Sequence, residues 1–130
     1  MARILVIDDD RLLRGTVEVI LTSDGHDVAA ARDGREGLGR LRSDSFDLVA
    51  CDVFMPNREG LDTVRAIRAV CASVPIIAFT GGPGYDADPA FEAELRRAAG
   101  LGAMETLQKP FRRQELLALV RRCLDGAGAS

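Results

Sequence analysis

Acidic side chains cluster at two points of the sequence. Asp8, Asp9 and Asp10 follow the first apolar run of the chain, and Asp52 follows a later one. Carboxylates that are brought close together repel one another, so the pKa of at least one rises unless a cation is present. Carboxylate oxygens suit a hard divalent ion, and Mg²⁺ commonly takes a few of them while it keeps several waters. We therefore expect a Mg²⁺ site made by Asp9 and Asp52, with Asp8 contributing through a water molecule.

Two further polar side chains end short apolar runs. Thr80 follows residues 76–79, and Lys109 is the single lysine among the 17 basic residues, the others being arginine. An ammonium is a compact point charge, whereas a guanidinium is a planar group with several donors, so the two are not interchangeable. The lysine directly before Pro110 and Phe111 is therefore a candidate for chemistry.

Each of these residues also has a purely structural interpretation. Asp10, and in part Asp9, can cap a following helix, because acidic side chains favour a helix N-terminus. Asp52 can initiate a turn, while Lys109 and Thr80 can be ordinary residues at the end of a strand. We accept the capping role for Asp10, and the other interpretations stay open at this level.

Apolar runs and helical patterns alternate along the chain. Short runs of apolar, often β-branched residues predict strands that are buried on both faces, and apolar residues at helical spacing follow each run. The strands are expected at residues 4–7, 28–31, 48–51, 76–79 and 104–108, the last with the weakest apolar pattern. Five strands that are each followed by a helix predict an α/β fold with a parallel sheet. Sites in such sheets lie beyond the carboxyl ends of the strands, where the polar residues above are found.

Composition limits the class of protein. The chain has 130 residues, enough for one domain with a core, and its 47% hydrophobic and 28% charged residues are typical of globular proteins. A net charge of −3 offers no broad basic surface for nucleic acid. No apolar stretch approaches the roughly 20 residues that span a bilayer, and the three cysteines are expected to be reduced core residues. We expect a cytoplasmic domain over residues 1–124, followed by a frayed tail over 125–130.

Four segments, in this order and each ending a predicted strand, are more specific together than any of them alone. They are residues 4–10, 47–56, 76–81 and 102–111. Together they resemble the receiver domain of two-component response regulators, in its stand-alone, CheY-like form, and the resemblance extends from about residue 3 to 124. It implies a doubly wound, flavodoxin-like (βα)5 fold with three layers and a parallel sheet of order 2-1-3-4-5.

The resemblance also implies which residues hold the metal ion and the phosphoryl group. Asp52 would accept a phosphoryl group from a phosphohistidine on a sensor histidine kinase. Mg²⁺ would be bound directly by Asp9, by Asp52 and by the backbone carbonyl of Phe54, and through water by Asp8.

The phosphoryl oxygens would be contacted from the remaining strand ends. Lys109 would pair with one oxygen, while the hydroxyl of Thr80 and the backbone N–H of Gly81 would donate to others. Cationic and hydrogen-bonding groups of this kind suit phosphoryl transfer, in which negative charge is spread over three oxygens. The family also implies a cis peptide bond before Pro110. One position departs from the family's pattern, because Thr106 stands where an aromatic residue of the conformational switch is often found.

The expected function is that of a phosphoacceptor that assists its own phosphorylation and dephosphorylation, not of an enzyme acting on a separate substrate. Its partners would be a sensor histidine kinase and either a downstream protein target or a histidine phosphotransfer protein, without direct nucleic-acid contact or membrane insertion. Two other classes remain open. Residues 8–12 loosely resemble the nucleophile segment of haloacid-dehalogenase-type phosphohydrolases, which would use Asp8, and a pseudo-receiver would scaffold a complex without being phosphorylated.

Overall fold

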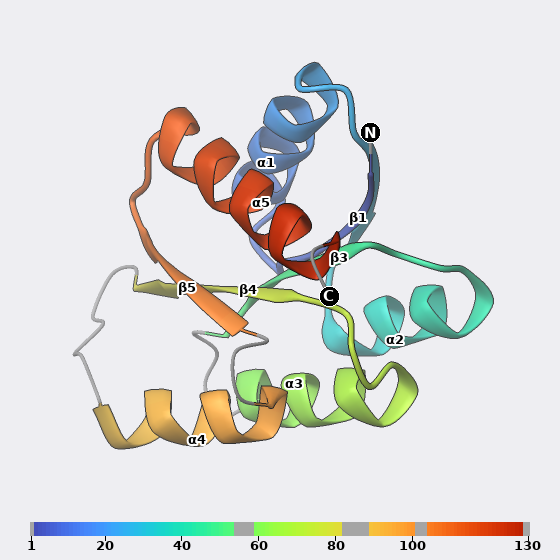
Figure 1. The fold of residues 1–130 in the computed structure, drawn as a ribbon, viewed down its shortest axis with the longest axis vertical. Helices are drawn as coiled ribbons and strands as arrows, with labels where there is room; N and C mark the ends of the chain where they lie inside the picture. Colours follow the sequence, from blue (N-terminus) through green and yellow to red (C-terminus); the bar gives the residue numbers. More distant parts are fainter. Residues whose placement is uncertain (1, 54–58, 82–88, 101–103, 129–130) are drawn as a thin grey trace.

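Residues 2–53, 59–81, 89–100 and 104–128 are described by a computed structural model of the chain. In these residues five strands and five helices alternate (Figure 1). The strands are β1 (Arg3–Ile7), β2 (Asp27–Ala31), β3 (Leu48–Asp52), β4 (Ile76–Gly81) and β5 (Met104–Lys109). The helices are α1 (Arg11–Ser23), α2 (Gly34–Ser43), α3 (Glu59–Val70), α4 (Pro89–Ala99) and α5 (Arg113–Gly128).

All neighbouring strands are parallel, and their order is β2-β1-β3-β4-β5. The order implied by the family resemblance is therefore confirmed. The strand expected at residues 104–108 is confirmed as β5, and its weak apolar pattern follows from its place at the edge of the sheet, where it pairs with β4 alone. Because every strand points the same way, the ends of β1, β3, β4 and β5 meet at one edge of the sheet.

Helices cover both faces of the sheet. In Figure 1, α1 and α5 lie on one face, and α2, α3 and α4 lie on the other. The side chains of β1 alternate between the two layers, as in any pleated strand: Ile4 and Val6 belong to the core under α1 and α5, while Leu5 and Ile7 belong to the opposite core. All four are fully buried, which explains the uninterrupted apolar run in the sequence.

Capping side chains fix where the first two helices begin. The Asp10 carboxylate accepts hydrogen bonds from the backbone N–H groups of Leu12 at 3.0 Å and Leu13 at 3.2 Å. Asp33 caps α2 in the same way, by accepting from the N–H of Glu36 at 2.8 Å. Such caps satisfy N–H groups that have no partner inside the helix. The capping role expected of Asp10 is confirmed, and it anchors the start of α1 directly beside Asp8 and Asp9.

Helix α5 includes part of the C-terminal tail. A frayed tail is expected from residue 125, and α5 includes residues 125–128, ending at Gly128. Once a helix has formed, each further residue adds one hydrogen bond at little cost, so α5 extends past its last apolar contact.

The cysteines are free as expected, with Cys51 buried and the other two half-buried. None of the described helices combines the length and the apolar character that a membrane span would need.

Candidate phosphoacceptor site

Three of the four aspartates singled out in the sequence meet at the carboxyl edge of the sheet. Ile7 of β1 pairs with Cys51 of β3, which places the residues that follow them side by side. One carboxylate oxygen from each of Asp8, Asp9 and Asp52 lies within 4.8 Å of the others. Asp8 is 1% exposed and Asp52 is 4% exposed, whereas Asp9 faces solvent.

Lys109 joins this cluster from the far side of the sheet. Its Nζ lies 3.4 Å from Asp8 Oδ2 and 3.3 Å from Asp52 Oδ2. Because β4 separates β5 from β3, the lysine side chain must extend past the end of β4 to reach these carboxylates. A long, flexible stem with a compact charge suits that position better than a planar guanidinium does. This ammonium is thus shared between two buried carboxylates.

Hydrogen bonds hold both the backbone and the side chain of Asp8. Its backbone N–H donates to the Ala31 carbonyl at 3.1 Å, and its Oδ1 accepts from the N–H of Asp10 at 2.9 Å. Burial raises the pKa of Asp8, although the Asp10 hydrogen bond and Lys109 act in the opposite direction. The nearby charge of Asp9 also raises this pKa. The carboxylate therefore lies where its ionised form is costly unless a cation neutralises it.

The donor set of the site fits Mg²⁺. Three carboxylates lie close together, and among the described residues one lysine ammonium pairs with two of them, so negative charge is in excess. The donors are all oxygens, and a hard divalent ion prefers oxygen ligands. Asp9 is open to solvent, which leaves room for the water molecules that Mg²⁺ usually retains. Phe54, whose carbonyl was expected as a further ligand, lies outside the described residues.

Thr80 and Gly81 end β4 at the same edge. Thr80 is half-buried, and Gly81 has a φ of +90°. A Cβ atom at Gly81 would lie 2.9 Å from the carbonyl oxygen of Lys109, so both the conformation and the space favour glycine. Gly81 pairs with Lys109 in the sheet register, which places both residues beside β3 and the acidic cluster. The expected cis bond between Lys109 and Pro110 is confirmed.

Sequence reasoning missed two residues of this region. Arg14, in the first turns of α1, donates from Nη1 to the backbone carbonyl of Asp8 at 2.8 Å. Gly60 lies in the first turn of α3, where a Cβ atom would be 2.3 Å from the carbonyl oxygen of Val53. The sequence gives a weak indication of the Arg14 contact. A helix that begins at residue 11 starts close to the end of the first strand, so a side chain in its first turn can reach back to that strand end. The sequence gives no indication of the close approach at Gly60.

Cys51, directly before Asp52, has a structural role. It is fully buried, and burial raises the pKa of its thiol, so the group stays protonated. Its Sγ donates to the backbone carbonyl of Asp52 at 3.4 Å. The expectation of a reduced core residue is confirmed for this cysteine.

Residues 4–121 match the family model of the response regulator receiver domain. The chain belongs to this family. Receiver domains are the phosphoacceptor modules of two-component systems, in which a histidine kinase is the phosphodonor, and they typically bind Mg²⁺.

Several relatives carry the same receiver domain within longer chains. The chain is 40% identical over 136 aligned positions to the response regulator MprA of Mycolicibacterium vanbaalenii, an alignment that covers 98% of this chain and 55% of the relative. It is 39% identical over 124 positions to MprA of Mycobacterium tuberculosis H37Rv, covering 94% and 50%. The chain thus spans about half the length of the curated relatives it matches.

Solved receiver domains have the same fold. A CheY-like response regulator receiver domain from Methanospirillum hungatei superposes with a TM-score of 0.87 at 25% identity, covering 99% of this chain and 98% of that one. The chemotaxis protein CheY4 of Vibrio cholerae gives a TM-score of 0.82 at 32% identity, covering 95% and 99%. The receiver fold is therefore shared over nearly the whole chain.

Proposed function

We propose that this receiver domain accepts a phosphoryl group from a phosphohistidine onto Asp52, with Mg²⁺ bound by Asp9, by Asp52 and, through water, by Asp8. The observation that carries the proposal is the position of Lys109. Its ammonium lies 3.3 Å from Asp52 and 3.4 Å from Asp8, between two buried carboxylates at the edge where the family has its phosphorylation site. A structural ion pair needs one carboxylate, whereas a site for a transferred phosphoryl group needs a nucleophile, a metal site and a cation.

In the proposed reaction a carboxylate oxygen of Asp52 forms a bond to phosphorus while the bond between phosphorus and the donor's imidazole nitrogen breaks. The imidazole keeps the electron pair of the broken bond and its ring takes up one proton from solvent, so the histidine returns to its neutral form. Mg²⁺, when it is bound, neutralises negative charge on the phosphoryl oxygens. Lys109 supplies a second positive charge to them. The Thr80 hydroxyl and the Gly81 N–H are proposed to donate to the remaining oxygens, and the carbonyl of Phe54 is proposed as a further metal ligand.

The output of the domain is proposed to be altered docking to a protein partner in the cytoplasm. Thr106, at the position where the family often has an aromatic switch residue, is half-buried on β5 and pairs with Ala78 of β4. A threonine cannot fill the space of an aromatic ring, so the response to phosphorylation must use other side chains. Phe79, which is buried directly before Thr80, stacks on Phe111 with ring centroids 5.2 Å apart. This pair connects the residues beside Thr80 and Lys109, and we propose that it carries the response.

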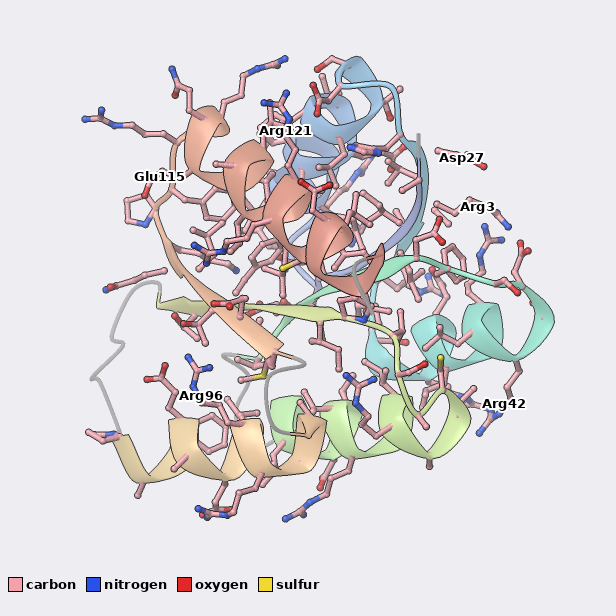
Figure 2. All side chains as sticks on the ribbon, viewed as in Figure 1. Arg3, Asp27, Arg42, Arg96, Glu115 and Arg121 are labelled. Atoms are coloured by element: carbon pink, nitrogen blue, oxygen red, sulfur yellow. The ribbon has the colours of Figure 1, made fainter. Side chains whose placement is uncertain are left out.

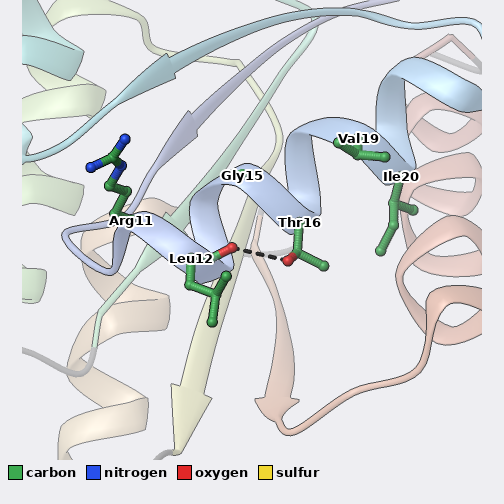
Figure 3. A pocket seen from close by; sticks show the side chains of 6 residues that line it. All are labelled: Arg11, Leu12, Gly15, Thr16, Val19 and Ile20. Atoms are coloured by element: carbon green, nitrogen blue, oxygen red, sulfur yellow. Dashed lines mark hydrogen bonds between the residues drawn. The ribbon is translucent and has the colours of Figure 1, made fainter.

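The exposed face of α1 is the proposed docking site of the phosphodonor. Leu12 is 81% exposed and Val19 is 68% exposed, and these are the large apolar side chains left exposed in the described part of the chain. With Gly15 and Thr16 between them they line a shallow groove of about 660 Å³ (Figure 3). An exposed apolar patch often marks a protein interface. Because α1 begins beside Asp9, a partner helix in this groove would hold its phosphohistidine near Asp52.

Reaction with a small phosphodonor tests the proposal without a kinase. The purified domain is incubated with acetyl phosphate and Mg²⁺, or with acetyl phosphate and EDTA, and its intact mass is measured. We expect one phosphoryl group per chain with Mg²⁺ and almost none with EDTA. No incorporation in the presence of Mg²⁺ would support the pseudo-receiver alternative instead.

A further inference from the structure

We propose that Arg14 is a positioning residue for the metal site: its guanidinium fixes the peptide that joins Asp8 and Asp9, and so places the carboxylate of Asp9 for Mg²⁺. The inference rests on the proposed function, since it concerns the same metal site. It assigns a role to a residue outside the expected set of ligands and phosphoryl contacts.

The contact is made to the backbone between the two acidic residues. Arg14 Nη1 donates to the carbonyl oxygen of Asp8 at 2.8 Å, and the arginine is half-buried. This carbonyl belongs to the peptide unit that ends at the Cα atom of Asp9. Because a peptide unit is planar, a hydrogen bond that holds its oxygen also restricts the position of that Cα atom.

The position of the Asp9 carboxylate depends on the backbone more than the positions of the Asp8 and Asp10 carboxylates do. The side chains of Asp8 and Asp10 are held by hydrogen bonds from backbone N–H groups. Within the described residues the Asp9 carboxylate takes part in no hydrogen bond or ion pair, and it is exposed to solvent. Its location is therefore set by the backbone on either side. On the side of Asp8 that backbone is held by Arg14, and on the other side by the start of α1.

Arg14 also carries a positive charge, and the two effects have opposite signs. A fixed cation near the site weakens the binding of Mg²⁺, whereas an oriented ligand strengthens it because less freedom is lost on binding. Removal of the arginine therefore distinguishes the two roles. If charge dominates, the affinity for Mg²⁺ rises, and if positioning dominates, it falls.

The experiment measures Mg²⁺ binding by isothermal titration calorimetry on the metal-free domain at constant ionic strength. Loss of a group that orients a metal ligand commonly lowers affinity, and we expect Arg14→Met to bind Mg²⁺ about tenfold more weakly than wild type. The matched control is Arg11→Met, which removes an exposed arginine from the same turn of α1. This control is expected to bind Mg²⁺ as tightly as wild type or slightly more tightly.

Two additional measurements separate positioning from general damage. Acetyl phosphate labelling at saturating Mg²⁺ is expected to restore most of the wild-type rate in Arg14→Met, because only metal affinity is lowered. Arg14→Lys keeps the positive charge and a donor nitrogen, and it is expected to bind Mg²⁺ more tightly than Arg14→Met but more weakly than wild type. This variant keeps the test decisive if Arg14→Met folds poorly. Equal or tighter Mg²⁺ binding by both Arg14 variants overturns the inference alone, whereas a wild-type domain that binds no Mg²⁺ overturns the proposed function as well.

Discussion

Lys109 and Asp8 are 101 positions apart in the sequence, yet the lysine Nζ lies 3.4 Å from the aspartate Oδ2. The Asp8 side chain is fully buried, and that of Lys109 is 16% exposed, so solvent screens this pair only weakly. The same ammonium is 3.3 Å from Asp52. One cation shared by two buried carboxylates leaves the edge of the sheet with excess negative charge.

Replacement of Asp8 by Asn should stabilise the metal-free domain at neutral pH. The variant removes a buried carboxylate but keeps an oxygen that can accept the hydrogen bond from the N–H of Asp10, which is 2.9 Å long in the wild type. Lys109 and Asp52 then form a balanced pair. We expect a Tm in EDTA that is higher by roughly 3–6 °C, and a smaller increase in Tm on addition of Mg²⁺. A lower Tm in EDTA would show that the Asp8 charge is stabilising.

The difference in Tm between Asp8→Asn and the wild type should depend on pH. Burial raises the pKa of Asp8 above its ordinary value of 3.8, so the folded domain holds this proton more tightly than the unfolded chain does. The contribution of Asp8 to the stability of the metal-free wild type therefore falls as the pH rises from 3.8 through the raised pKa of the folded state. The difference in Tm between Asp8→Asn and wild type should be large at about pH 7 and small at about pH 4. A constant difference would contradict this account of Asp8.

Removal of the lysine should slow phosphorylation at saturating Mg²⁺. Lys109→Gln keeps a polar side chain but removes the positive charge that faces the transferred group. Loss of one group that stabilises developing charge costs on the order of 10²–10³ in rate. The measurement is the rate of acetyl phosphate labelling at saturating Mg²⁺. An unchanged rate would assign Lys109 a structural role only.

The close packing at Gly60 predicts a large cost for a small side chain. Gly60→Ala would place its Cβ 2.3 Å from the Val53 carbonyl oxygen, so α3 must shift away from the end of β3. We expect a loss of about 1–3 kcal/mol in the free energy of unfolding by urea denaturation. The matched control is Gly39→Ala in α2, where no atom lies within 4 Å of the added Cβ. The control should gain about 0.5–1 kcal/mol, because alanine favours a helix over glycine. Equal effects of the two variants would contradict the packing argument.

The docking surface on α1 is tested by a charge in its groove. Val19→Glu should reduce phosphotransfer from any histidine kinase that phosphorylates the wild type, because a carboxylate would be buried against the partner. Labelling by acetyl phosphate, which needs no docking, should be unchanged. Ala69→Glu is the control, since Ala69 is exposed on α3 at the other face of the sheet. If both variants transfer phosphate as wild type does, the kinase docks elsewhere.

Much of the fold follows from local patterns in the sequence. Ile4 to Ile7 form an uninterrupted apolar run because β1 is covered on both faces, and Asp10 and Asp33 start their helices as capping chemistry predicts. The meeting of Asp8, Asp52 and Lys109 was predictable because the ends of parallel strands share one edge. These features depend on single helices or strands, or on the fact that all strands of the sheet run in the same direction.

Features that depend on close approach between elements could not be predicted. By helix propensity alone Gly37 only weakens α2, but a Cβ there would lie 2.4 Å from Ile7 Cδ1. The length of the hydrogen bond from Arg14 to Asp8, for which the sequence gives only a weak indication, depends on where α1 leaves the sheet. Ion pairs such as Arg3 with Asp27, seen at the start of β1 in Figure 2, depend on the strand register. Each of these distances is set by packing, which no spacing of residue types encodes.

The residue that carries the phosphoryl group distinguishes this account from a phosphohydrolase-like use of Asp8. After reaction with acetyl phosphate and Mg²⁺, the acyl phosphate is reduced with borohydride, and the modified residue is located by peptide mass spectrometry. We expect modification of Asp52 alone, and no modification of the Asp52→Asn variant. A phosphoryl group on Asp8, in the wild type or in that variant, would contradict it.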